Sequence, residues 1–137
     1  MPGFRPRRAA PARTMKLAQL VPIAAGVVES TRRKLPKDIR EAALRVPVHF
    51  EPAPDEAVIA EGFEPDILGL FTGASYGSEL SQDNPSPPQI ILYINSLWDY
   101  SDRDTDVFRD EVQLTYLHEL GHYLGWDEGQ VALRGLD

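Results

Sequence analysis

The segment HELGHYLGWDE, residues 118–128, contains two of the three histidines of the chain. These two histidines are four residues apart, and a glutamate follows the first of them. Four residues of an α-helix advance by about 400°, so His118 and His122 are expected one turn apart on the same helix face. Two imidazoles in this arrangement can bind one zinc ion, which is the physical basis of the HExxH pattern. The segment therefore predicts a metal centre on a helix.

Glu119 has an expected role that follows from its place beside the first histidine. Its carboxylate can reach a zinc-activated water, accept a proton from it as general base, and later pass that proton to a leaving amine. The alternative is a helix whose histidines serve packing or solvation, since so short a pattern recurs by chance. The context favours the metal site, because an apolar helical run precedes the motif and Gly125 can end the helix in a left-handed turn.

A catalytic zinc site takes three protein ligands, so a third ligand is expected. A metzincin has a histidine three residues after the turn glycine, where this chain has Glu128, and it also has a methionine turn, whereas the only methionines here are Met1 and Met15. A gluzincin takes a glutamate from a second helix well downstream, and only fifteen residues follow His122 in this sequence. Glu128 is the first choice because of its register, and the other candidates are Asp127, Asp137 and the distant His49.

Residues 118–128 resemble the motif of the small bacterial zincin-like metallopeptidases, which is HExxHxxGxx followed by an acid. The resemblance covers about residues 17–137, and it includes the order of expected elements around LPKDIREAAL and DILGLFTG. The loop SQDNPSPP and the Arg-rich N-terminus depart from the family pattern. Carried over by position, the resemblance implies metal ligation by His118, His122 and Glu128. It also implies a compact, minimal zincin-like α+β fold, in which a small mixed sheet packs against the HExxH helix.

Composition limits the classes of partner. The chain of 137 residues is long enough for one domain with a real core. It has no cysteine, which excludes disulfides and thiolate metal ligands. The formal net charge is −7, and the first fourteen residues contain four arginines and no acid, so the remainder is more acidic still. Such a surface repels phosphate, and nucleic acid is therefore not an expected partner.

The N-terminal residues 1–14 are rich in proline, alanine and arginine, and they are expected to form a disordered tail. Residues 15–137 are expected to form a single zincin-like metallopeptidase domain, with Met15 as an alternative start. The apolar run after Lys16 fits either a signal peptide or an amphipathic helix. The helix is favoured because no A-x-A site follows, and the run is too short and interrupted to span a membrane. We therefore expect a cytoplasmic monomer.

Local patterns predict the remaining elements. Apolar residues at helical spacing predict helices over residues 17–34, 37–45 and 106–124. Runs rich in β-branched and aromatic residues predict strands over 46–50 and 89–98 and a short strand within 66–77. The segment EPAPDEA, residues 51–57, is expected to form a turn. Thr105 or Asp106 is expected to be the N-cap of the last helix.

Other residues have weaker expected roles. The strand at 89–98 precedes the motif helix, and an exposed edge there can pair with an extended peptide, although a plain core strand fits equally well. Glu111 shares the helix face of His118 two turns earlier, so it is either an indirect partner of the metal or a solvated carboxylate. Three tyrosines can donate a hydrogen bond to the oxyanion of the reaction, namely Tyr76, Tyr93 and Tyr123.

The sequence as a whole predicts a zinc metallopeptidase with one zinc ion per chain and a peptide or protein substrate. Two other functions remain open: a non-catalytic, zinc-stabilised binding module, and a metal-dependent hydrolase of a non-peptide bond. A purely structural zinc site has no need of Glu119, so the presence of this glutamate favours an enzyme.

Overall fold

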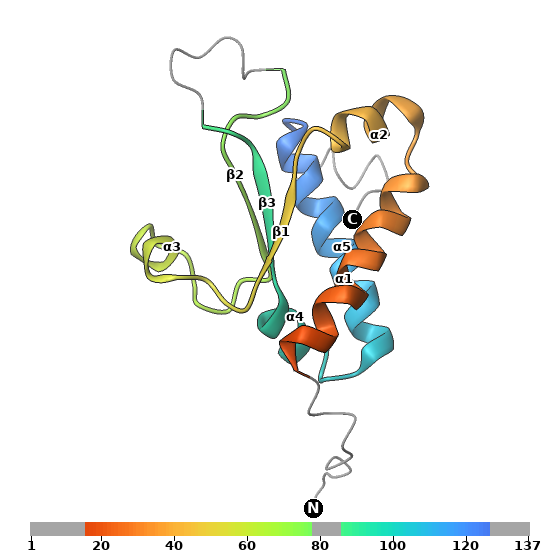
Figure 1. Ribbon diagram of the computed structural model, residues 1–137. Helices are drawn as coiled ribbons and strands as arrows, with labels where there is room; N and C mark the ends of the chain where they lie inside the picture. Colours follow the sequence, from red (N-terminus) through yellow and green to blue (C-terminus); the bar gives the residue numbers. More distant parts are fainter. Residues whose placement is uncertain (1–15, 78–85, 127–137) are drawn as a thin grey trace, which may run out of the picture.

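The chain folds into five helices and three strands in the part that the computed structural model describes, residues 16–77 and 86–126 (Figure 1). The elements are, in chain order, α1 (Leu17–Arg33), α2 (Lys37–Ala43), β1 (Val48–Glu51), α3 (Glu56–Ala60), β2 (Gly69–Thr72), β3 (Gln89–Tyr93), α4 (Ile94–Tyr100) and α5 (Thr105–Tyr123). The predicted α+β class is confirmed.

The three strands form one mixed sheet in the order β1-β3-β2. The central strand β3 runs parallel to β1, with Phe50 opposite Leu92, and antiparallel to β2, with Phe71 opposite Ile90. Strand β3 is therefore paired on both sides, while β1 and β2 are the two edges. Of the two alternatives for the strand before the motif helix, an exposed edge and a plain core strand, the structure shows the core strand.

Helices α1 and α5 pack together against one face of the sheet (Figure 1). Ile90 and Leu92, alternate residues of β3, are fully buried in the core that these helices cover. The buried stripe of α5 recurs at helical spacing and includes Phe108, Val112 and Leu120. The predicted packing of a small mixed sheet against the HExxH helix is thus confirmed, and it places the motif beside the sheet.

Two predicted elements differ from the structure near the sheet. The predicted strand 89–98 ends at Tyr93, and residues 94–100 form α4 instead. Ile94, Leu97 and Trp98 are the buried residues of α4, at the spacing of one helix face. The predicted turn at 51–57 was wrong in its second half, because Asp55 accepts a hydrogen bond from the Val58 amide and starts the short helix α3.

The N-cap of α5 also differs from the prediction. The Asp104 side chain accepts a hydrogen bond from the Val107 amide at 3.0 Å, so Asp104 is the cap rather than Thr105 or Asp106. Asp102 and Arg103 before it both have positive φ, 55° and 58°, which turns the chain sharply between α4 and α5. Among the described residues, no helix is long and apolar enough to cross a membrane.

Candidate metal centre

Helix α5 brings together His118, Glu119 and His122 near its C-terminal end. One ligand atom from each of the three side chains lies within 4.8 Å of the others, and all three side chains are partly buried. The two imidazole rings are edge to face, with centroids 4.8 Å apart and planes at 81°. In the described part of the chain, this is the only cluster of three or more histidine, aspartate or glutamate side chains so arranged.

The donor set fits a zinc ion. Imidazole nitrogen and carboxylate oxygen are ordinary zinc ligands, and the two histidines converge without any change in the helix. Glu119 differs from the two histidines in its contact with the sheet. Its Oε1 accepts a hydrogen bond from the Phe71 amide at 2.9 Å. The residues present can therefore hold zinc through two imidazoles, with Glu119 alongside.

The end of α5 has the geometry that the glycine at 125 predicts. Gly125 has φ of 82°, in the left-handed region that favours glycine. Its amide donates to the His122 carbonyl, and the Trp126 amide donates to the Gly121 carbonyl, both at 2.9 Å. These two bonds form a Schellman motif and close the helix directly after the second histidine.

The predicted third ligand lies outside the described residues, which end at Trp126 on this side. Glu128 and the alternatives Asp127 and Asp137 therefore stay predictions. His49 does lie within the described part, and it is exposed on β1, outside the His–Glu–His cluster. Glu111, the suggested indirect partner, is partly buried on α5 and also outside that cluster.

Edge strand β2 lies alongside the motif and supplies a functional group that the sequence did not reveal. The Phe71 amide that binds Glu119 belongs to the backbone of β2. The Tyr93 amide donates to the Leu68 carbonyl, so the residues of β2 that hydrogen-bond to β3 alternate from 68 onward. The backbone groups of Gly69 and Phe71 consequently point away from β3, and the Phe71 amide meets Glu119 of α5.

A cavity of about 350 Å³ opens between β2 and α5 at the motif. Its lining is apolar apart from the motif side chains and Thr115, and comprises Leu68, Gly69, Leu114, Thr115, His118 and Glu119. Gly69 permits the close approach of the two elements, because a Cβ at that position would lie 2.7 Å from the Thr115 Cγ2 atom. The motif therefore faces an open, largely apolar cavity.

The three tyrosines proposed as oxyanion donors occupy two different places. Tyr76 and Tyr123 pack edge to face with ring centroids 5.8 Å apart, and Tyr123 follows His122 directly in the chain. Tyr93 is fully buried, and its hydroxyl has no hydrogen-bond partner among the described residues. Burial raises the pKa of Tyr93, and the charges of Glu51 and Asp55 raise it further. Tyr93 thus lies in the surroundings of β1 and α3.

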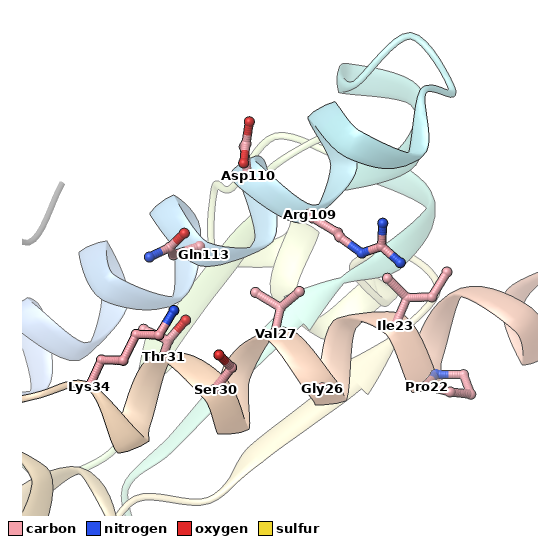
Figure 2. Close-up of a pocket in the computed structure, with 10 residues that line it drawn as sticks. All are labelled: Pro22, Ile23, Gly26, Val27, Ser30, Thr31, Lys34, Arg109, Asp110 and Gln113. Carbon is pink, nitrogen blue, oxygen red and sulfur yellow. The ribbon is translucent and has the colours of Figure 1, made fainter.

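A second cavity, of about 440 Å³, lies between α1 and α5 (Figure 2). Ser30 and Thr31 line it from α1, Lys34 lines it from the C-cap of that helix, and Arg109 extends from α5 toward Ile23 (Figure 2). No histidine or glutamate lines this cavity, although it is the larger of the two. The arrangement of ligating side chains, rather than cavity size, therefore identifies the candidate metal centre.

A helix bearing HExxH, packed against a small mixed sheet with an edge strand beside the motif, is the arrangement of a zincin. Residues 43–136 match the zincin-like metallopeptidase family, and the chain belongs to that family. No curated protein matches the chain significantly. The match includes all three strands and all of α5, and thus both elements that line the site, β2 and α5.

Proposed function

We infer that the protein is a zinc-dependent peptidase whose active site is the cluster on α5. The observation that supports this function most directly is the convergence of His118, Glu119 and His122 within 4.8 Å, at a cavity open to substrate. Membership of the zincin-like metallopeptidase family supports the same reaction class. We assign His118 and His122 as zinc ligands, Glu128 as the third ligand, and Glu119 as the general base.

The assigned roles follow from the chemistry of the side chains. When bound, zinc lowers the pKa of a coordinated water to about 7 and polarises a carbonyl group. Glu119 accepts the proton of the attacking water and then donates it to the leaving amine, because a carboxylate beside the ligand histidine can reach both atoms. His118 and His122 present their ring nitrogens on one side of α5, which leaves the cavity at Gly69 for the substrate.

Strand β2 is the element best placed to align a peptide. An extended peptide can pair with an edge strand through backbone hydrogen bonds, and its side chains then enter neighbouring pockets. The backbone groups of Gly69 point away from β3, and Gly69 also lines the cavity at the motif. A substrate paired there lies next to Glu119, while Leu68 and Leu114 offer apolar contacts to its side chains.

The decisive experiment compares the zinc-loaded wild-type protein with Glu119→Gln on a library of peptides. The amide side chain has nearly the same size but cannot accept the proton, so we expect the variant to bind zinc while losing at least about 100-fold in turnover. Equal cleavage by both proteins would refute the mechanism. Zinc binding without cleavage by either protein would instead support a metal-stabilised binding module.

A further inference from the structure

The hydrogen bond between the Phe71 amide and Glu119 is a contact between a strand edge and the assigned general base. The two residues are 48 positions apart in sequence, and the donor–acceptor distance is 2.9 Å. The bond is partly buried, so water competes with it less than at an open surface. Because a backbone amide donates to a carboxylate, the interaction belongs to the stronger, charge-assisted class.

We propose that the backbone amide of Phe71 positions Glu119 for catalysis and that the close contact of Gly69 with Thr115 sets the distance at which it does so. The proposal rests on the assignment of Glu119 as the general base. Glutamate has three rotatable side-chain bonds, and an unrestrained carboxylate samples many orientations. The amide holds one oxygen of Glu119 in place before the substrate arrives, which is the preorganisation that an efficient proton acceptor requires.

The proposal needs β2 to stand at a fixed distance from α5, and the packing at Gly69 provides it. Thr115 is buried on α5, one turn before Glu119, and Gly69 lies two residues before Phe71 on β2. A Cβ atom on residue 69 would approach the Thr115 Cγ2 atom to 2.7 Å and the Ile91 carbonyl oxygen to 3.2 Å. An added side chain at residue 69 therefore forces a shift between β2 and Thr115, and a shift of the strand carries the Phe71 amide with it.

The side chain of Phe71 also holds this residue in position beside α5. Its ring packs edge to face on the ring of Tyr123, with centroids 5.7 Å apart. Tyr123 is fully buried and follows His122 directly on α5. The side chain of Phe71 is thus fixed to the metal-ligand end of the helix, while its amide is fixed to the base.

The hydrogen bond can be tested directly in the zinc-loaded protein by amide hydrogen exchange measured with NMR. Phe71 faces away from β3, so only its bond to Glu119 is expected to protect its amide. Glu119→Ala should therefore accelerate exchange at Phe71 by roughly tenfold or more, the effect expected for losing a charged acceptor. The Leu70 amide, which faces Ile91 in the sheet ladder, is the internal control and should not change. Unchanged exchange at Phe71 would overturn the proposal.

The effect on catalysis can be tested by removing the amide proton alone. Phe71→Pro lacks the N–H, and proline is tolerated on an edge strand where the N–H does not pair with the sheet. Phe71→Leu also lacks the aromatic ring but retains the amide, so it is the matched control. We expect kcat of the proline variant to fall about 10- to 100-fold below that of the leucine variant, with KM and zinc affinity nearly unchanged.

Whether the contact between Gly69 and Thr115 sets the distance from β2 to α5 can be tested by a rescue experiment, without a proline substitution. Gly69→Ala should lower kcat because the new methyl group displaces β2 from Thr115. Thr115→Ser removes the Cγ2 atom, so the double variant should regain most of the lost turnover.

If the zinc-loaded wild type cleaves peptides while Phe71→Pro matches Phe71→Leu, the positioning role is wrong and the proposed function stands. If the wild type cleaves nothing, the function fails, and the exchange measurement still tests the bond.

Discussion

Glu119 contacts two parts of the fold at once, its own helix and the edge of the sheet. The two histidines come from the same helix and are near it by local geometry alone. The Phe71 amide comes from β2 and reaches Glu119 only through tertiary packing. A substitution of either histidine and a substitution on β2 are therefore expected to affect different properties, metal binding in the first case and proton transfer in the second.

At the residue scale, the first prediction concerns the two histidines. The purified protein should contain about one zinc ion per chain, and either His118→Ala or His122→Ala should lose it, because the remaining ligands bind weakly. Metal analysis after dialysis measures this directly. His49→Ala is the matched control, since His49 is exposed on β1, and it should retain the metal. Full zinc retention in both α5 variants would rule out the site.

The third ligand gives a second prediction at this scale. Glu128→Ala should lower zinc affinity by orders of magnitude, whereas Asp127→Ala should cost at most about 10- to 100-fold, the effect of a residue that only orients a ligand. Glu128→His should restore part of the affinity because imidazole is also a zinc ligand. Competition with a chelator of known affinity measures all three. A greater loss in Asp127→Ala would move the ligand to residue 127.

The motif residues could be predicted from sequence because their geometry is local. His118, Glu119 and His122 lie on one helix, and the helical repeat alone places them together. The Phe71 amide could not be predicted, because every residue except proline has such an amide and only the strand register selects this one. Gly69 lies in the short strand predicted within residues 66–77, but only the structure shows how closely its backbone approaches Thr115.

At the scale of elements, α5 depends on the aspartate that caps it. Asp104→Ala removes the acceptor for the Val107 amide, so we expect a loss of about 1 kcal/mol in the free energy of unfolding. Urea denaturation measures this loss. Asp106→Ala is the control, because Asp106 lies within the first turn and forms only an exposed ion pair with Arg109, at 3.5 Å. A greater loss for Asp106→Ala would show that the helix begins later.

The boundary between β3 and α4 shows where sequence patterns fail at this scale. Residues 89–98 are almost continuously apolar, and a buried strand and a buried helix look alike in such a run. The spacing of Ile94, Leu97 and Trp98 indicated a helix, but it was hidden by the β-branched residues before it. Strand β3 is central and buried, so its own sequence also lacks the alternation of a strand with one solvated face.

At the scale of the whole molecule, Arg32 links three parts of the chain. Its Nε donates to the Tyr116 hydroxyl at 3.1 Å, and its Nη2 donates to the Val46 carbonyl at 3.2 Å. These bonds join α1, α5 and the segment that enters β1. Tyr116 is fully buried, and burial raises its pKa above 10.0, although Arg32 lowers it in part. The fold therefore favours the neutral phenol.

This preference predicts how stability depends on alkaline pH. The raised pKa of Tyr116 in the folded state gives a contribution to stability that is complete below about pH 10, the pKa in the unfolded chain, and is lost as the pH rises through the folded value. Tyr116→Phe should reduce the fall in the urea midpoint between about pH 9 and 11. Tyr100→Phe, at a side chain 63% exposed, should leave that fall unchanged.

The distance in sequence between Phe71 and Glu119 sets an order of events during folding. Helix formation takes about a microsecond, so the histidine pair can assemble as soon as α5 forms. The contact with β2 requires docking of a segment 48 residues away, which is slower because a longer loop must close. A folding chain can thus bring its two motif histidines together before Glu119 is oriented. The carboxylate assigned as general base is therefore oriented only once the sheet is in place beside α5.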